Sequence, residues 1–401
     1  MTFVEHILHQ MPQLSKPRFH FLVALFHALS CFVGRATMLN LSRYGAGSPR
    51  RLHRWFSQPF SWPSLNWMAL ESAGVCDHQL VACLDCTFLP KSGKKTWGLG
   101  KFHCGVTGQT ERGLEACVVG LVDLQEHTAY SLAVEQTPAE LDPEQSRVDF
   151  YIQTLLAQQE GLHAHGVTHV LADGYFAKTK VFDALGAHDL HSITKLRRDA
   201  SLRYLYQGPR RQGRGRPQKY EGKVDWSDLS RFEQAQSRQE GVELRWAKLN
   251  SPQFKRELLV VVVLWEHQGK TRRQVLASTD LSLEPATLEA WYRARFQQEF
   301  VFRDAKQFTG LCDGQMLDRN KRREHLNAEL RALNVMRLEE RAQQQGKAEP
   351  GPRVISIASW KRRKLAEHMV QRITAHLNLT PEQQLILHDQ SQWPALGLLA
   401  S

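Results

Sequence analysis

The sequence predicts an α/β protein in which a mixed sheet lies between helical segments at the two ends of the chain. Three observations predict this class. Three apolar runs typical of strands follow one another at 80–88, 113–124 and 128–136. Residues 144–197 then alternate helix, strand, helix and strand. A further set of strand-like segments at about 200–285 predicts a β-rich insertion into the same sheet domain.

Residues 1–75 are expected to form a helical domain. Apolar residues recur at helical spacing in the segment 19–34, but histidines interrupt it, and it is shorter than the ~20 residues of a membrane span. No small-residue cleavage site follows, so we interpret it as a buried bundle helix rather than a secretory signal. Residues 48–67 interleave Arg50, Arg51 and Arg54 with aromatic residues, which suits a helix on a phosphate backbone. The alternative is a small helical domain whose arginines face water.

Charge and cysteine usage narrow the class of protein. The chain has 52 Lys and Arg against 41 Asp and Glu among 401 residues, a balance common in proteins that bind polyanions such as nucleic acid, although many basic proteins bind none. The seven cysteines are odd in number and irregular in spacing, which argues against a disulfide framework. Cys83 and Cys86 form a C-x-x-C that no second pair completes, so buried free thiols are favoured over a zinc site.

The segment after Pro285 carries the most informative pattern. It predicts a long helix with Thr287 as N-cap, and from Trp291 it reads WYRARFQQEFVFRDAKQF. At ~100° per residue, four polar residues fall within about 60° of arc inside the aromatic face, and Gln297 and Asp304 point away. The four are Tyr292, Arg295, Glu299 and Lys306. Charges aimed at the core need partners, which metal ions and phosphates would supply. A structural Arg–Glu pair capped by a lysine is the alternative.

These four residues, with two, three and six residues between them, resemble the Tyr-Arg-Glu-Lys signature of a sub-group of DDE transposases of bacterial insertion sequences. The resemblance covers about residues 40–335. It implies an RNase H-like catalytic domain with one aspartate on the first strand, a second after the fourth, and a β insertion before the helix. The sequence offers Asp85 in LDCTF and Asp173 in LADGY. The expected domains are 1–75 for DNA binding, 76–335 for catalysis, and a helical 336–401 for dimerisation.

The resemblance also implies a chemistry. Asp85, Asp173 and Glu299 would hold two Mg²⁺ ions, with Mn²⁺ as a substitute, and Tyr292, Arg295 and Lys306 would contact phosphates of double-stranded transposon ends. Relatives can pass through a DNA hairpin with a flipped base, for which Phe296 or Trp291 is the stacking candidate here. The family implies a homodimer on DNA, target DNA as second substrate, and a bacterial, nucleoid-associated location.

Other basic and histidine-rich segments suit the same partner. Arg214-Gly215-Arg216-Pro217, with Arg210, Arg211 and Lys219 nearby, resembles an AT-hook, and a flexible basic loop that contacts only backbone is the favoured alternative. Four lysines after the first strand would guide DNA or stay solvated: Lys91, Lys94, Lys95 and Lys101. Three histidines could suggest a metal site but are more typical of a surface: His163, His165 and His169.

The sequence therefore predicts a transposase that cuts transposon ends and joins them to target DNA. Two alternatives remain. One is a catalytically inactive DNA-binding descendant of such an enzyme. The other is an RNase H-fold nuclease that hydrolyses DNA without joining it.

Overall fold

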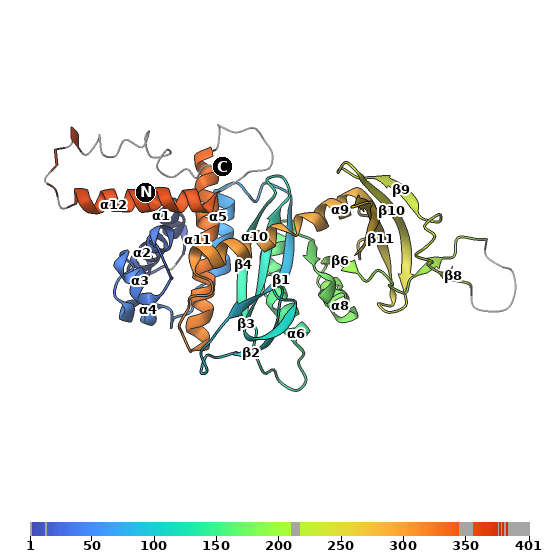
Figure 1. Ribbon diagram of the computed structural model, residues 1–401, viewed down its shortest axis with the longest axis horizontal. Helices are drawn as coiled ribbons and strands as arrows, with labels where there is room; N and C mark the ends of the chain where they lie inside the picture. The colour runs from blue at the N-terminus through green and yellow to red at the C-terminus, as the bar shows by residue number, and fades with distance from the viewer. Residues whose placement is uncertain are drawn as a thin grey trace.

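The structure is a computed structural model that describes residues 2–12, 14–209, 217–344 and 356–375, together with residues 377, 379, 380, 382 and 383. A 12-stranded mixed sheet runs through it, with helices packed along part of its length (Figure 1). The N-terminal helices lie at one end of the molecule, and the strands that follow residue 200 lie at the other.

Five helices form the N-terminal bundle: α1 (Phe3–Gln10), α2 (Lys16–Cys31), α3 (Met38–Arg43), α4 (Pro49–Trp55) and α5 (Trp62–Ser72). The expected buried helix is α2. Its Phe21 stacks on Trp55 of α4 with 5.4 Å between ring centroids. The apolar sides of the bundle belong to the same continuous core as the sheet. In the described part of the chain, no helix combines the length and apolar character that crossing a bilayer requires.

The central part of the sheet is formed by β1 (Leu80–Pro90), β2 (Gly100–Cys104), β3 (Gln109–Asp123), β4 (Thr128–Gln136), β5 (His169–Ala172) and β6 (His191–Leu196). The order β4-β3-β1-β5-β6 is antiparallel up to β1 and parallel from β1 to β6. Helices α6 (Arg147–Leu156), α7 (Gln159–Ala164) and α8 (Thr179–Gly186) connect β4 to β5 and β5 to β6. This arrangement is RNase H-like, as predicted, with the short strand β2 as an addition that the sequence patterns did not indicate.

The β-rich insertion extends this sheet rather than forming a separate one. Its strands are β7 (Arg203–Leu205), β8 (Tyr220–Lys223), β9 (Glu233–Gln236), β10 (Val242–Ser251), β11 (Arg256–His267) and β12 (Lys270–Ser278). Strand β12 pairs antiparallel with β6. The apolar run of β11 is explained by burial on both faces, because Leu259 and Val261 join the main core while Leu258 and Val260 join a second core.

The helix expected after Pro285 is broken into three pieces. Helix α9 (Pro285–Ala294) ends before Arg295, α10 (Gln297–Asp304) follows after two turn residues, and a π-helix, η2 (Ala305–Thr309), closes the segment. Glu284, not Thr287, is the N-cap of α9, and the Thr287 hydroxyl donates to the Glu284 carboxylate instead. The expected unbroken stripe of charges is therefore interrupted twice.

Two further helices complete the chain: α11 (Arg319–Gln344) and α12 (Ile357–Thr374). Helix α11 packs on β4, and its Asn327 and Asn334 bond to backbone N–H and C=O groups of Val134 and Ser131, completing hydrogen bonds for the backbone of this strand. Helix α12 packs on α2 and α11. The polar segment 341–353, whose Gly, Pro and Gln content is typical of a linker, begins inside α11, and most of it lies outside the described residues.

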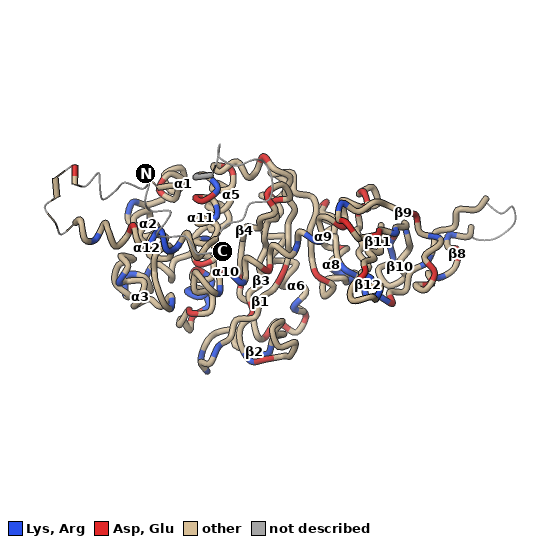
Figure 2. The backbone as a smooth tube through the Cα atoms, turned by 45° about the horizontal axis from the view of Figure 1, so that its top comes forward, with Lys and Arg blue, Asp and Glu red and all other residues tan. Residues whose placement is uncertain are grey.

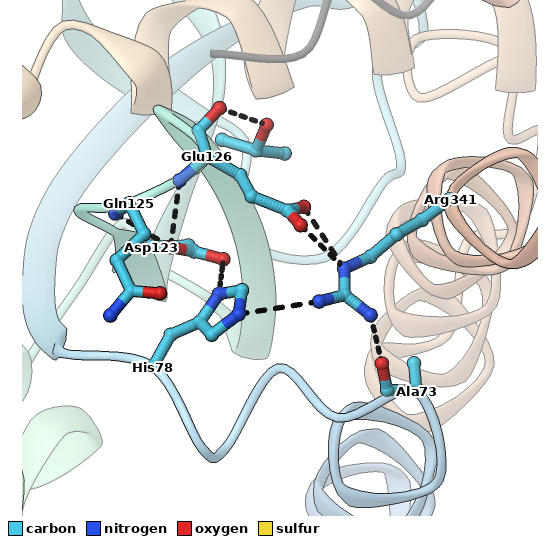
Figure 3. A network of polar contacts seen from close by, with 7 residues as sticks. Ala73, His78, Asp123, Gln125, Glu126 and Arg341 are labelled. Carbon is cyan, nitrogen blue, oxygen red and sulfur yellow. Dashed lines mark hydrogen bonds and ion pairs between the residues drawn. The ribbon is translucent and has the colours of Figure 1, made fainter. Parts of the chain in front are cut away.

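The far end of α11 is fastened by a buried ionic network (Figure 3). The Arg341 guanidinium donates to both carboxylate oxygens of Glu126 at 2.9 and 3.0 Å and to the Ala73 carbonyl. His78 lies 2.7 Å from Asp123 in the same cluster. The network joins the end of α5, the β3–β4 turn and α11, so it fixes the helix that covers the sheet.

Candidate active site

Asp85 and Asp173 lie side by side on neighbouring parallel strands. Leu84 of β1 is in register with Ala172 of β5, and each aspartate is the next residue along its strand direction. Parallel strands lie ~4.8 Å apart, so this register brings the two carboxylates to one edge of the sheet. The backbone N–H of Cys86 donates to Asp85 at 2.8 Å, and that of Tyr175 donates to Asp173 at 2.9 Å.

Arg295 joins the strand-borne and helix-borne acids. One guanidinium nitrogen donates to Asp85 at 2.9 Å, and another donates to Glu299 of α10 at 2.9 Å. The side chain of Arg295 is 15% exposed and that of Asp85 is 17% exposed, whereas Glu299 is 44% exposed. One cation therefore sits between two carboxylates at the bottom of the site, and the glutamate faces solvent.

The electrostatics couple Asp85 to the other two acids. Burial, with smaller contributions from the charges of Asp173 and Glu299, raises the pKa of Asp85 to about 6 against the attraction of Arg295. Burial disfavours the charged form of Arg295, yet the combined attraction of Asp85, Cys83, Tyr292 and Glu299 outweighs it, and the pKa of the guanidinium rises. Burial raises the pKa of Tyr292 to about 12, with Arg295 opposing the shift and Asp173 adding to it.

The carboxylate oxygens of the three acids do not form a group in which all ligand atoms lie within 4.8 Å of one another. Among the described residues, two other groups of possible metal ligands do: His27, Cys31 and His368, and His78, Asp123 and Glu126. Asp85 and Glu299 are held apart because the Arg295 guanidinium lies between them. In this arrangement Arg295 supplies the positive charge that three converging carboxylates require.

Two cavities meet at Tyr292 and Arg295. The first, of about 570 Å³, lies between α9 and the insertion and is lined by Trp265 and Phe296 among others. The second, of about 500 Å³, includes Asp173 in its lining. Phe296 is half exposed at the break between α9 and α10, and its ring packs edge-on against Phe300 at 5.0 Å. Arg295 therefore lines both cavities, and both lie against residues of the insertion.

Two other predictions about this segment need correction. Lys306 lies in the π-helix, whose i→i+5 turn displaces it from a regular helical line, and Cys312 and Cys104 are the groups that oppose its burial-lowered pKa. Asp304 does not face water but is buried and bonded to Arg337 at 2.9 Å. Trp291, the other stacking candidate, packs edge-on against His169 at 5.0 Å.

The predicted basic residues fall in several places (Figure 2). Arg50 and Arg54 are exposed on α4 and Arg51 is partly buried, while Lys94 and Lys95 are exposed in the β1–β2 loop. Lys91 instead donates to the Gly314 carbonyl at 2.6 Å, and Lys101 is exposed on β2. Arg210, Arg211, Arg214 and Arg216 lie outside the described residues.

The three expected surface histidines do not converge. His165 stacks on Trp67 with 4.0 Å between ring centroids and lies 2.8 Å from Glu71. His169 is buried and lies 3.1 Å from Asp280. His163 is exposed on α7, and the described metal-ligand groups contain none of the three.

Two features of the site had no recognised signal in the sequence. Tyr175 is half exposed beside Asp173, and the Lys178 ammonium lies 3.5 Å from its ring centroid. Gln298 is fully buried next to Glu299, against a β-bulge where Gly120 leaves room for its amide. Both residues neighbour a predicted acid in the sequence, but neither belongs to the four-residue pattern.

Comparison with known protein families identifies the family of this chain. The DDE superfamily endonuclease family matches residues 10–252, more than half of the chain, including Asp85 and Asp173. None of the curated proteins searched matches the chain. DDE endonucleases act on DNA and generally use divalent metal ions. The chain belongs to the DDE superfamily endonucleases.

Proposed function

We propose that this chain is a transposase that cuts DNA at the ends of its own element and joins the 3′ ends to target DNA, by a two-metal mechanism. The observation that carries the proposal is the Arg295 bridge between Asp85 and Glu299, with Asp173 following the parallel strand next to that of Asp85. The Tyr-Arg-Glu-Lys resemblance favours joining over simple hydrolysis.

The donor set suits a hard divalent cation. Carboxylate oxygens are the ligands that Mg²⁺ and Mn²⁺ prefer. The bridging Arg295 shows that a positive charge is already accommodated between Asp85 and Glu299. Asp85, Asp173 and Glu299 would hold two ions, which when bound would activate the attacking oxygen and stabilise the leaving oxygen of the phosphodiester.

The protein's own groups would bind and orient the DNA end. Arg295 can release Asp85 and Glu299 when metal binds and use the same guanidinium to grip a phosphate in a bidentate way. Burial raises the pKa of Tyr292 to about 12, so its hydroxyl stays protonated well above neutral pH and would donate to a phosphate oxygen. Lys306 would approach the DNA from the π-helix as a point charge.

The cavity beside Phe296 supports a hairpin route. Phe296 is half exposed, and Trp265 contributes a second aromatic ring to the lining of the same cavity. A base flipped out at the hairpin tip would stack on such rings. In this scheme Phe296→Ala reduces hairpin formation while first-strand nicking continues.

The remaining parts have assigned roles in the proposal. The helices up to residue 75, with Arg50, Arg51 and Arg54, bind the transposon end through its backbone. Lys94, Lys95 and the arginines at 210–216 contact flanking DNA. Residues 76–335 catalyse the reaction, residues 336–401 contribute to a homodimer on DNA, and the protein acts at the bacterial nucleoid.

A reconstituted reaction tests the proposal. The purified full chain is incubated with Mg²⁺, target DNA and a donor carrying the ends of its own element. Strand-transfer products are expected from the wild type and absent from Asp85→Asn. Asp183→Asn, which changes a surface aspartate bonded to Arg256, is the matched control and keeps activity. Cleavage without joining would instead indicate a nuclease, and a mobility shift without cleavage would indicate an inactive DNA-binding descendant.

A further inference from the structure

A second group of metal-ligand side chains lies far from the acids in the sequence, where α12 crosses α2. His27 and Cys31 are four residues apart on α2 and therefore share one face of the helix. His368 of α12 faces them, with its Nδ1 atom 2.9 Å from Nε2 of His27. The ligand atoms of all three residues lie within 4.8 Å of one another.

We propose that His27, Cys31 and His368 form a zinc site that fastens α12 to the N-terminal bundle. Two imidazoles and a thiolate are a common Zn²⁺ donor set, with bonds of ~2.0–2.1 Å to nitrogen and ~2.3 Å to sulfur. Tetrahedral geometry with such bonds separates the ligand atoms by roughly 3.3–3.8 Å. The His27 and His368 nitrogens lie 2.9 Å apart and the Cys31 sulfur lies within 4.8 Å of both, so the three ligand atoms are close enough for a small side-chain adjustment to bring them to one ion.

Burial gives the site one protected side and one open side. Cys31 is 1% exposed and His368 is 8% exposed, whereas His27 is exposed. An ion can therefore enter past His27 and keep a water as fourth ligand, while the thiolate stays shielded from oxidants. Three protein ligands and an open position are compatible with zinc coordination.

The other described ligand group shows by contrast why this one is a candidate. In the cluster of His78, Asp123 and Glu126, the Arg341 guanidinium already supplies the cation (Figure 3). Near Cys31, the Lys361 ammonium donates to the carbonyls of Leu29 and Phe308. Within the described part of the chain, no ion pair or hydrogen bond joins a lysine or arginine to the ligand atoms of His27, Cys31 or His368.

The surrounding charges set the strength of the site. Lys364 and Arg372 act on His27 and His368 as positive charges and oppose a bound cation. Glu367 acts on His27 with the opposite sign. Burial raises the pKa of the Cys31 thiol to about 11, and Lys361 partly opposes this shift. The thiolate and Glu367 together offset part of this repulsion, so we expect binding weaker than that of a closed four-ligand site.

The first test uses metal and spectroscopy on the full chain. Co²⁺ replacing Zn²⁺ is expected to give the absorption of tetrahedral cobalt with a sulfur-to-cobalt charge-transfer band, at one ion per chain. The band should disappear in Cys31→Ser and in His27→Asn. The His27 side chain is exposed, so its replacement leaves the core intact. Cys76→Ser changes a partly buried thiol outside the group and should keep the band.

A second variant separates this site from the catalytic acids. Asp85→Asn should keep the cobalt–sulfur band, because the proposal does not depend on the function of the acids. Added Zn²⁺ should raise the thermal midpoint of the wild type and leave that of Cys31→Ser unchanged. The proposal is overturned if the wild type gives no sulfur-to-cobalt band, or if the band survives in Cys31→Ser.

Discussion

The guanidinium of Arg295 lies 2.9 Å from the carboxylate of Asp85, which precedes it by 210 residues in the chain. The same guanidinium bonds to Glu299, so a single cation holds two of the three acids that we assign to metal binding. Replacing Arg295 tests whether a metal ion can compensate these acids in place of the guanidinium.

Arg295→Gln should destabilise the metal-free protein by about 3–5 kcal/mol, because it leaves the largely buried carboxylate of Asp85 uncompensated. Mg²⁺ should then raise its thermal midpoint more than it raises that of the wild type, since the ions replace the missing charge. Thermal denaturation with and without Mg²⁺ measures both effects. Arg231→Gln, which removes a 47% exposed arginine bonded to the half-exposed Glu221, is the control. An equal Mg²⁺ effect in Arg295→Gln and the wild type would refute the idea.

Gly120→Ala should disturb the support of Glu299. A methyl group at Gly120 would overlap the amide of Gln298. This α10 side chain is fully buried against the β3 bulge. Overpacking of this kind costs about 1–3 kcal/mol and should displace α10. Chemical denaturation measures the cost, and Mn²⁺ affinity measures the displacement. Gly105→Ala, where an added methyl group meets open space, should change neither quantity.

The strands and the two aspartates were predictable because their signals are local. An apolar run such as LVACLDCTF with one carboxylate specifies both a buried strand and a polar group at its edge, and β1 and β5 then align Asp85 with Asp173. The continuous burial of β11 follows from its run of valines. Local sequence is sufficient to predict an element when each of its residue types has a single physical reason to be there.

The break between α9 and α10 and the burial of α11 were not predictable in the same way. No Gly or Pro marks the turn at Arg295–Phe296. Asp304 looked solvent-exposed on a regular helix, but its partner Arg337 lies on another element. His27 and His368 are 341 residues apart, so no local pattern could have joined them.

Arg341→Met should be among the most destabilising single changes outside the active site. It removes the guanidinium that donates to Glu126 and Ala73 and leaves Glu126 buried without that charge (Figure 3). Breaking a buried pair in this way costs about 3–5 kcal/mol. Arg323→Met, which removes a 43% exposed partner of Glu135, should cost about 0–1 kcal/mol. Equal unfolding free energies for the two variants would show that the network is not a structural anchor.

His325 and Glu329 predict an unusual pH dependence of stability. Both are buried, with His325 Nδ1 3.0 Å from the Glu329 carboxyl. Burial lowers the pKa of His325 to about 3 and raises that of Glu329 well above 4.5, so the folded pair is neutral and keeps one proton on the carboxyl. The unfolded pair also carries one proton between pH 4.5 and 6.5. Above pH 6.5 the unfolded chain loses that proton, and below pH 4.5 it gains a second, so stability from this pair falls on both sides.

Glu329→Gln isolates the histidine. The loss of stability above pH 6.5 should disappear, because no carboxyl remains to hold a proton. The loss on the acid side should begin near pH 6.5 instead of 4.5, since only the unfolded His325 then takes up a proton. Urea denaturation across pH 4–8 measures the two limbs, and an unchanged profile in the variant would contradict the assignment.

The most direct test of the account is calorimetric titration of Mn²⁺ into the full chain bound to its transposon-end DNA. If Asp85, Asp173 and Glu299 hold the ions jointly, Asp85→Asn, Asp173→Asn and Glu299→Gln should each weaken the same binding event at least tenfold, while Asp183→Asn matches the wild type. Unchanged Mn²⁺ binding in any one of the three acid variants would contradict the account.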